Sequence, residues 1–207
     1  MNSWIIFIIG GIAQLLFSAR SIVQWFISEK QKKVLTPTGY WKLSLLASFL
    51  LFIYGYLRND FAIMLGQSLT YFIYIRNMQL QGEWVKLNKF IRLFLYIFPV
   101  LILIYGYTNG IYDKTKLFQN ENIPFWLFIL GITSQLLFTF RFIFQWMYSE
   151  KKGKSSLPLG FWILSFCGSL AILVYGIFRK DPVLIVGHVF GLIMYGRNIS
   201  FIRTKKV

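Results

Sequence analysis

Two arginines lie inside long apolar segments of this sequence, where a positive charge is costly. Arg20 and Arg141 each lie in the second half of a segment long enough to cross a bilayer. An arginine at the centre of a membrane span costs about 2.5–3.5 kcal/mol on insertion scales, so such residues usually have a functional partner. The guanidinium carries a rigid fork of N–H donors that matches the oxygens of a phosphate. The chemistry that these residues predict is binding of an anion such as a lipid phosphate.

Polar side chains share a helix face with each arginine. Around Arg20 this stripe consists of Gln14, Gln24 and Ser28. The same stripe recurs at identical spacing as Gln135, Arg141, Gln145 and Ser149. The repetition favours a shared internal cavity lined by both stripes. The alternative is that each guanidinium snorkels toward cytoplasmic lipid phosphate, with Glu29 or Glu150 as its ion-pair partner.

A second set of polar residues is predicted to form the opposite wall of that cavity. It lies on one face of the third apolar segment in each half of the chain, and comprises Gln67, Thr70, Tyr74 and Asn77, then His188, Gly191, Tyr195 and Asn198. Hydrogen bonding between helices explains each of them at least as well as ligand contact does. We interpret His188 as a packing histidine rather than a proton relay. Arg76 and Arg197, near the cytoplasmic edge, are interpreted as topology anchors, with head-group phosphate binding as the alternative.

Small residues on the second apolar segment of each half predict close helix packing. The stripe reads Trp41, Ser44, Ser48 and Gly55 in the first half, and Trp162, Ser165, Ser169 and Gly176 in the second. Small side chains at helical spacing let neighbouring helices approach closely. We therefore interpret both stripes as packing surfaces.

All these residues recur because the chain contains one unit twice. Residues 14–30 read QLLFSARSIVQWFISEK and residues 135–151 read QLLFTFRFIFQWMYSEK, a displacement of 121 positions. Of the 71 pairs aligned at this displacement from Gly10 to Leu80, 27 are identical, which is far above chance for unrelated segments. The sequence therefore predicts two copies of one module.

The composition is that of an integral membrane protein. The residues are 57% hydrophobic and only 14% charged, whereas soluble domains carry nearly twice that charged fraction. The apolar segments are predicted as transmembrane helices, because a bilayer admits few other backbones. They cover approximately Trp4–Ile27, Thr38–Leu57, Phe61–Leu80, Phe90–Tyr107, Phe125–Tyr148, Leu159–Phe178 and Pro182–Ile202. The first segment lacks a basic region before it and recurs later in the chain, so we expect it to be retained rather than cleaved.

The fourth segment has no counterpart, so the seven helices are arranged as three plus one plus three. Three spans alone would invert the second copy, and a fourth returns the chain to its starting side. The predicted fold is all-α, with two parallel three-helix bundles joined by an inversion-linker helix that carries no chemistry. The predicted domains are 1–81 for the first repeat, 82–124 for the linker with the fourth helix, and 125–207 for the second repeat.

The basic residues predict the orientation of the chain and its partners. The net charge is +15, and twelve lysines and arginines flank one side of the predicted spans against five on the other. Because cytoplasmic loops carry the excess of these residues, the amino terminus is predicted outside and the carboxyl terminus in the cytoplasm. We expect the basic loops to contact anionic membrane lipids. We expect no nucleic-acid partner, because no soluble basic face is predicted.

The sequence shows no set of residues typical of a catalytic or metal site. It contains one histidine and one cysteine, without a metal-ligand cluster, a phosphate loop or a nucleophile elbow. We therefore predict that the chain is not an enzyme and uses no cofactor.

The repeated motifs resemble those of the lipid A biosynthesis N-terminal domain family. They are QLLFxxRxxxQWxxSEK, PxGxW, S-x3-S, YG, and YxRN at the end of the third segment. These three-helix modules occur fused to, or named after, lipid-A-disaccharide synthase, and are distantly similar to PQ-loop and SWEET-type transporters. The resemblance implies two bundles around a central substrate path in the bacterial inner membrane. Because the chain ends at Val207, soon after the seventh segment, we expect the glycosyltransferase domain to be absent and do not carry over the synthase activity.

The resemblance implies a lipid substrate, either a polyprenyl-phosphate-linked sugar or a related anionic glycolipid. We predict a transporter or flippase in which Arg20 and Arg141 hold the phosphate while glutamines and asparagines bond sugar hydroxyls. Two alternatives remain open: a facilitator for a small soluble sugar, which two inward arginines disfavour, and a non-catalytic subunit that assists a membrane glycosyltransferase. The predicted substrate-binding residues are Gln14, Arg20, Gln24, Glu29, Gln67, Tyr74, Arg76, Asn77, Gln135, Arg141, Gln145, Glu150, His188, Tyr195, Arg197 and Asn198.

Overall fold

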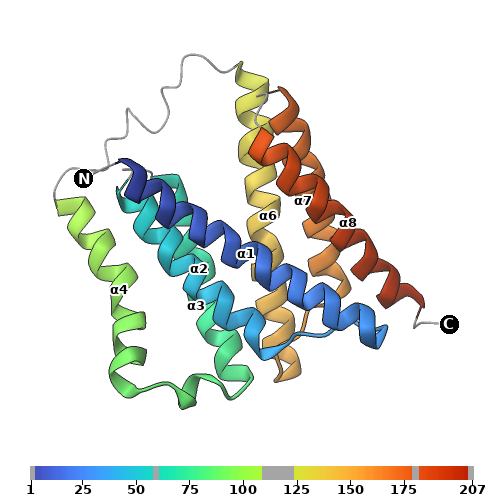
Figure 1. The fold of residues 1–207 in the computed structure, drawn as a ribbon, viewed down its shortest axis with the longest axis horizontal. Helices are drawn as coiled ribbons and strands as arrows, with labels where there is room; N and C mark the ends of the chain where they lie inside the picture. Colours follow the sequence, from blue (N-terminus) through green and yellow to red (C-terminus); the bar gives the residue numbers. More distant parts are fainter. Residues whose placement is uncertain (1–2, 58–60, 109–123, 179–181, 205–207) are drawn as a thin grey trace. The chain divides into compact units, whose positions relative to one another are not determined.

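The structure is a computed structural model that describes residues 3–57, 61–108, 124–178 and 182–204 (Figure 1). Within these ranges the chain is helical and has no strand. The helices are α1 (Ser3–Gln31), α2 (Thr38–Leu57), α3 (Phe61–Leu80), the short 3₁₀ helix η1 (Trp84–Lys86), α4 (Lys89–Thr108), α6 (Phe125–Lys152), α7 (Leu159–Phe178) and α8 (Pro182–Thr204). The bounds of α2, α3 and α7 are those predicted, and α1, α4, α6 and α8 extend the predicted segments by a few residues. The predicted all-α class is confirmed.

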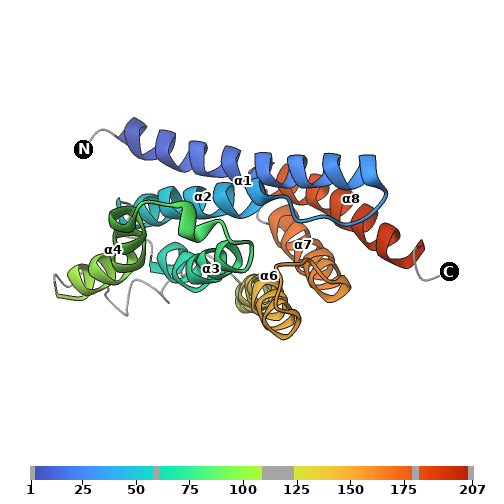
Figure 2. The same ribbon diagram turned by 90° about the horizontal axis from the view of Figure 1, so that it is seen from below.

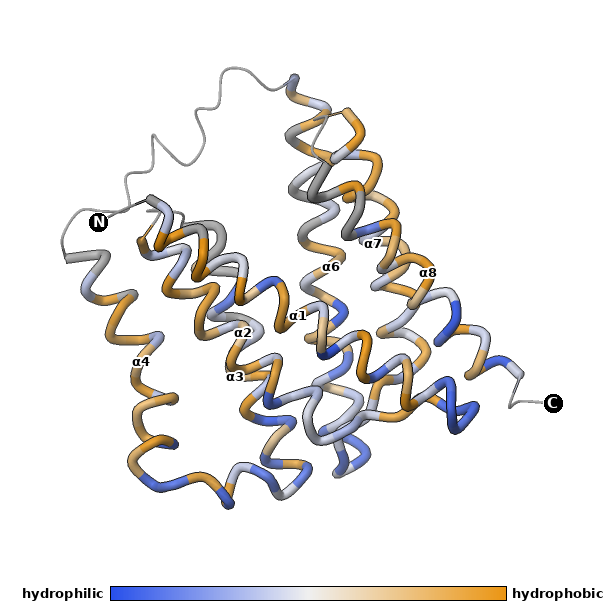
Figure 3. Tube along the Cα trace, viewed as in Figure 1, coloured by the Kyte–Doolittle hydropathy of each residue, from blue (hydrophilic) through white to orange (hydrophobic). Residues whose placement is uncertain are grey.

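Four of the described helices are long and apolar enough to cross a membrane. These spans are Trp4–Gln31, Thr38–Leu57, Phe125–Lys152 and Leu159–Phe178. Figure 3 shows hydrophobic residues along most of the helices, with hydrophilic residues gathered near helix ends and in the loop between α3 and α4. The length and composition of these four helices are consistent with a membrane location. The seven-span, three-plus-one-plus-three arrangement stays a prediction.

The chain divides into two compact units. The first contains the described residues of Met1–Val23 and Pro37–Asn120, and the second those of Gln24–Thr36 and Glu121–Val207. The predicted domain limits at residues 81 and 125 follow the sequence repeat, whereas these units follow spatial contacts. By those contacts α4 belongs to the first unit, and the last turns of α1 belong to the second.

In the first unit α2 and α3 lie side by side (Figure 1). Trp41 is fully buried, and its ring lies 5.9 Å from that of Tyr74 on α3, measured between centroids. Ser44 and Ser48 of α2 are also fully buried. Small side chains allow two helices to approach closely, which agrees with the interpretation of this stripe as a packing surface.

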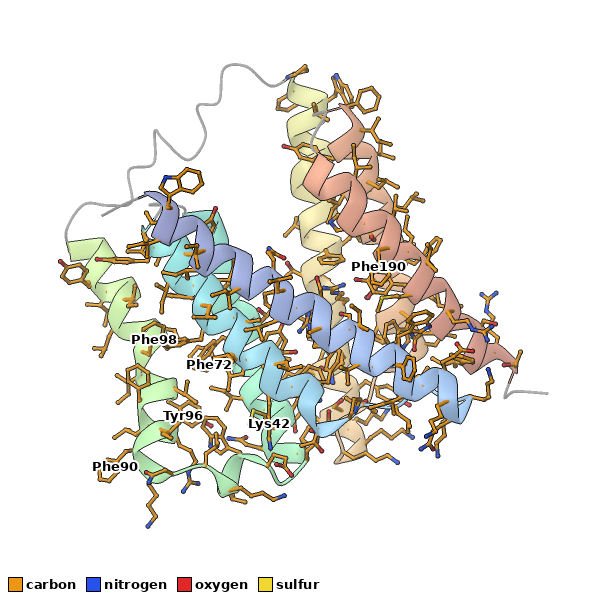
Figure 4. The ribbon with its side chains drawn as sticks, in the orientation of Figure 1. Lys42, Phe72, Phe90, Tyr96, Phe98 and Phe190 are labelled. Carbon is orange, nitrogen blue, oxygen red and sulfur yellow. The ribbon has the colours of Figure 1, made fainter. Side chains whose placement is uncertain are left out.

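α4 packs on α2 through aromatic rings. The ring of Phe98 lies 4.5 Å from that of Phe49 and 5.9 Å from that of Phe52, centroid to centroid. Figure 4 shows Phe98 and Tyr96 projecting from α4 toward the other helices of the unit, and Phe90 projecting away from them. Phe90 is 83% exposed. These described contacts of α4 are packing contacts.

An ion-pair cluster holds η1 against α2. The carboxylate of Glu83 lies 2.6 Å from Nζ of Lys42 on α2 and 2.5 Å from Nζ of Lys86 in η1 (Lys42 is labelled in Figure 4). Hydrogen bonds from Lys42 and then from Lys86 lower the pKa of Glu83 below its usual range. The carboxylate therefore stays ionised at neutral pH and connects the end of α3 to the start of α2.

In the second unit α7 lies between α6 and α8 (Figure 2). α6 and α7 lie close together at Gly168, where a Cβ atom would lie 3.1 Å from the backbone nitrogen of Phe138. The repeat is visible in the contacts as well as in the sequence. A Cβ at Gly131 would meet the ring of Tyr175 at 3.0 Å, and a Cβ at its counterpart Gly10 would meet the ring of Tyr54 at 2.8 Å.

α6 ends in a left-handed cap. Gly153 has a φ of 64° and donates its N–H to the carbonyl of Glu150, while Lys154 donates to the carbonyl of Ser149. This pair of bonds is a Schellman-type ending, in which glycine avoids the clash that a Cβ atom causes. Lys32, the repeat counterpart of Gly153, ends α1 with a φ of 49°.

Gly153→Ala is expected to lower the free energy of unfolding by about 1–2 kcal/mol, because an L residue is strained in this backbone conformation. No atom lies within 4 Å of the added Cβ, so the loss would come from the backbone alone. Gly11→Ala is the matched control: it also meets nothing within 4 Å but lies in α1, where alanine is favoured by about 0.8–1 kcal/mol. Thermal unfolding in detergent measures both variants. Shifts of the same sign would contradict a left-handed cap at Gly153.

Candidate functional site

Arg141 of α6 lies inside the second unit among aromatic rings. Its side chain is 6% exposed, and Cζ lies 3.3 Å from the ring centroid of Phe138. The rings of Phe142, Phe161 and Tyr195 follow at 4.6, 5.7 and 6.0 Å. Phe161 lies on α7 and Tyr195 on α8, so all three helices of the repeat contribute. Rings that face a guanidinium stabilise its charge by about 0.5–2 kcal/mol each.

The edge of the Arg141 guanidinium has fewer partners than its face. Nη1 donates to the Tyr195 hydroxyl at 3.3 Å, and Nε is buried with no hydrogen-bond partner among the described residues. The indole N–H of Trp162 is likewise buried and without a partner among them. The ring of Trp162 lies 5.0 Å from that of Phe161 and 6.0 Å from that of Tyr195. A buried donor without an acceptor costs about 1–3 kcal/mol, so this cluster has donors that an anion would satisfy.

Arg20 of α1 has equivalent surroundings in the first unit. It is 6% exposed, and its Cζ lies 4.6 Å from the ring of Phe17, 5.1 Å from Tyr40 and 5.5 Å from Tyr74. These rings are the repeat counterparts of Phe138, Phe161 and Tyr195. Nη1 of Arg20 donates to Ser44 Oγ at 2.5 Å, and that hydroxyl donates to the carbonyl of Tyr40. The same construction therefore occurs twice, with a serine partner in the first copy and a tyrosine partner in the second.

The surroundings of both arginines do not fit the snorkelling alternative. A snorkelling arginine exposes its guanidinium, whereas these two are buried in protein. Glu29 accepts hydrogen bonds from Nε and Nη2 of Arg197 at 2.9 and 2.7 Å and pairs with Lys32 at 2.7 Å. Glu150 accepts from the indole of Trp146 at 2.9 Å. No ion pair between described residues neutralises Arg141.

Two of the predicted glutamines, Gln24 and Gln145, hold the loops that follow α1 and α6. Nε2 of Gln24 lies 2.9 Å from Ser28 Oγ and 3.3 Å from the carbonyl of Leu35. In the second repeat, Nε2 of Gln145 donates to Ser149 Oγ at 2.8 Å and to the carbonyl of Ser156 at 3.0 Å. These bonds fasten each loop to the last turns of the preceding helix. In these contacts the glutamines are structural residues next to the arginine clusters.

The remaining buried polar residues bond within and between helices. Ser48 donates to Oε1 of Gln67 at 2.9 Å, and at the equivalent position Ser169 lies 2.8 Å from Nδ1 of His188. Asn77 and Asn198 are fully buried, and each donates to the carbonyl four residues earlier at 2.9 Å. Asn198 Oδ1 also lies 3.1 Å from Nε2 of Gln24. Hydrogen bonding between helices, the first interpretation of Gln67 and His188, agrees with these contacts.

Three predicted residues lie elsewhere, and a fourth has no described side chain. Gln14 is exposed on α1, and the side chain of Gln135 lies outside the described side chains. Arg76 is exposed and donates to Gln79 at 3.0 Å, and Arg197 is exposed and bound to Glu29. The structure therefore brings Arg20 together with Tyr74, and Arg141 with Tyr195, and leaves Gln14, Arg76 and Arg197 outside the described contacts of both clusters.

Of the aromatic rings around the arginines, Tyr74 and Tyr195 belong to the predicted site, and the others are absent from it. Phe17 and Phe138 each precede the arginine by three residues, which places them on its helix face. The recurrence of phenylalanine at this position in both repeats could have indicated a ring next to each arginine. The aromatic pair Tyr40 and Phe161, at equivalent positions, could have done the same. Among the described residues no group of histidine, cysteine and acidic side chains is placed to hold a metal ion.

Arg141→Met is expected to stabilise the lipid-free protein by about 1–2 kcal/mol. The substitution keeps an unbranched side chain and removes a buried charge that lacks a carboxylate partner among the described residues, and such charges are costly. The measurement is the thermal midpoint in detergent stripped of bound lipid, where the expected rise is a few degrees. Arg203→Met, at an exposed position on α8, is the control and should change little. A marked loss of stability in Arg141→Met would mean that the protein itself neutralises this charge.

Comparison with known proteins agrees with the repeat. The family model described as Lipid A Biosynthesis N-terminal domain matches residues 9–79 and again residues 130–200. Each match corresponds to one three-helix repeat, and together they cover about two thirds of the chain. No solved structure matches the chain.

Curated relatives are longer proteins. The chain is 29% identical to the lipid-A-disaccharide synthase of Chlamydia felis and 27% identical to that of Chlamydia caviae, and each alignment covers 97% of this chain and 34% of the relative. It is 27% identical to the lipid-A-disaccharide synthase of Chlamydia abortus, over 95% of this chain and 33% of the relative. The chain thus spans about a third of the length of these relatives. With both repeats matched by one family model, the chain belongs to the Lipid A Biosynthesis N-terminal domain family and contains two tandem copies of that domain.

Proposed function

We propose that this protein is a membrane transporter or flippase for an anionic lipid-linked sugar of the polyprenyl-phosphate class. The observation that carries the proposal is the buried Arg141, whose charge has no carboxylate partner and whose Nε has no acceptor among the described residues. A phosphate supplies both a counter-charge and acceptor oxygens. Membership of the family supports a membrane role in lipid A or glycolipid biosynthesis.

In this proposal the guanidinium groups hold the phosphate, and the aromatic rings contact the apolar atoms on either side of it. The polyprenyl tail stays in the lipid. The protein lies in the bacterial inner membrane with its amino terminus outside and its carboxyl terminus in the cytoplasm. Movement of one repeat relative to the other transfers the head group between leaflets, as parallel repeats do in other transporters.

Reconstitution into liposomes tests the proposal. A fluorescent polyprenyl-phosphate-linked sugar is placed in both leaflets, and a membrane-impermeant quencher reports the fraction that reaches the outer surface. We expect nearly all of the probe to become accessible with the protein and about half without it. Accessibility that stays at about half in vesicles with folded protein would contradict transport.

The second candidate is a non-catalytic membrane subunit that assists a glycosyltransferase. It is favoured by one observation: the curated relatives named lipid-A-disaccharide synthase are about three times as long as the region that this chain matches. A module that stands next to a synthase region in one chain has the proximity that a lipid-presenting subunit needs. Co-purification with a membrane glycosyltransferase, together with no lipid movement by the isolated protein, would select this candidate.

A further inference from the structure

Each arginine cluster is built from the side chains of a single repeat. The rings around Arg141 come from α6, α7 and α8 and lie in the second unit. The rings around Arg20 come from α1, α2 and α3 and lie in the first unit. The family model likewise matches each repeat separately. Neither cluster needs a residue of the other repeat among its described contacts.

The guanidinium of Arg141 is positioned to bind an anion at its edge. Stacking uses the face of this planar group and leaves the N–H donors in its plane. Arg141 has Phe138 against its face at 3.3 Å, and Nε at its edge is buried with no acceptor among the described residues. In the first repeat, Ser44 occupies one edge position of Arg20. The counterparts of the same rings surround Arg20, so the first copy keeps this construction.

Neutral donors supplement the single cation of the second cluster. The Tyr195 hydroxyl lies 3.3 Å from Nη1 of Arg141, and the buried indole N–H of Trp162 has no acceptor among the described residues. Trp162 lies next to Phe161 and Tyr195, two of the rings around the guanidinium. One positive charge with neutral donors matches a singly charged phosphate diester better than a diphosphate, because excess negative charge would stay uncompensated in a buried site.

We infer that each repeat is a complete binding site for one phosphate diester, so that the chain binds two lipid-linked sugars, one at Arg20 and one at Arg141. This inference rests on the proposed function. It adds that two lipid molecules bind per chain and that each carries one negative charge on its phosphate. It differs from the single shared cavity that the sequence predicts, in which both arginines would hold one phosphate.

Native mass spectrometry of the full chain, titrated with undecaprenyl-phosphate-linked hexose, counts the sites. Uncharged undecaprenol corrects for adducts that depend on the tail alone. The wild-type protein and the exposed control Arg203→Ala should bind two molecules. Arg20→Ala and Arg141→Ala should each bind one, and the double variant none above the undecaprenol level.

The outcomes separate the inference from the proposed function. One bound molecule in the wild type, lost in either single variant, would overturn the two-site inference and leave the proposed function standing. No binding above undecaprenol in the wild type would contradict both.

Trp162→Phe provides a milder test, because it keeps an aromatic ring and removes the indole N–H. In the Arg20→Ala background it should weaken the remaining site about tenfold, since a hydrogen bond to a charged group is lost. In the Arg141→Ala background the same change should leave the remaining site unaltered. Equal effects in both backgrounds would contradict a donor role for Trp162 in the second repeat alone.

Discussion

Arg20→Ala combined with Arg141→Ala is expected to reduce the movement of lipid-linked sugar to the rate of protein-free vesicles. Loss of one partner from a buried, hydrogen-bonded charge pair costs about 2–5 kcal/mol, which is roughly a thirtyfold to several-thousandfold loss of affinity. Both arginine residues are 6% exposed, so water is poorly placed to replace their contact with the phosphate. The measurement is the quencher assay in liposomes with matched protein content.

Two control proteins make this result specific. Arg203→Ala removes an exposed arginine from α8 and should transport at the wild-type rate. The double lysine variant keeps both charges but loses the planar fork, so it should retain partial activity. Full transport by the folded double alanine variant would remove the phosphate from both clusters.

Gly168→Leu is expected to destabilise the protein by about 3 kcal/mol and to disable the second cluster. Overpacking of a tight contact typically costs about 1–3 kcal/mol, and here the contact is with backbone that cannot rotate away. The added Cβ would lie 3.1 Å from N and 3.3 Å from Cα of Phe138, whose ring stacks on Arg141. The helices must separate, and the ring under the guanidinium must move with them. Thermal unfolding and lipid titration in native mass spectrometry measure the two effects.

Gly11→Leu is the matched control for this substitution. Gly11 is an exposed helical glycine with no atom within 4 Å of an added Cβ, so leucine should be tolerated there. The first repeat has a fully buried alanine, Ala47, at the position equivalent to Gly168. Gly168→Ala should therefore be much milder than Gly168→Leu. Equal midpoints for Gly168→Leu and Gly11→Leu would contradict the close approach of α6 and α7.

The helices were predictable because long apolar runs and the internal repeat both restrict the sequence. The limits of α2, α3 and α7 follow from prolines, charged residues and the two copies of the module. Helix ends at the basic loops were less predictable. α1 continues to Gln31 and α6 to Lys152, since polar residues in a last turn can still make backbone hydrogen bonds. A prediction based on hydropathy assigns these polar last turns to loops.

The site was predictable in its charges but not in its neighbours. The cost of burying a charge drew attention to Arg20 and Arg141, and the structure shows that both are buried. The helical wheel then grouped Gln14 with Arg20, although Gln14 is exposed. A wheel shows only which residues share a face of one helix. Tyr40 and Phe161 come from a different helix, so their contact with the arginine depends on packing that the wheel does not contain.

The contacts of the glutamines could not be predicted from the sequence for a similar reason. A polar side chain near a buried arginine fits a ligand contact and a structural contact equally well at the level of sequence. Gln24 and Gln145 use their amide groups to hold Leu35 and Ser156, residues in loops whose path the helical pattern does not predict. The sequence shows that a glutamine amide can donate and accept hydrogen bonds. Which group it bonds depends on the fold.

In the proposed function the buried arginines bind the phosphate of a lipid-linked sugar. Native mass spectrometry of the protein extracted gently from its own membrane tests it most directly. We expect the wild-type chain to retain a polyprenyl-phosphate-linked sugar that is missing from the Arg20→Ala, Arg141→Ala double variant. Identical bulk phospholipid on both proteins, with no polyprenyl phosphate on either, would contradict the claim.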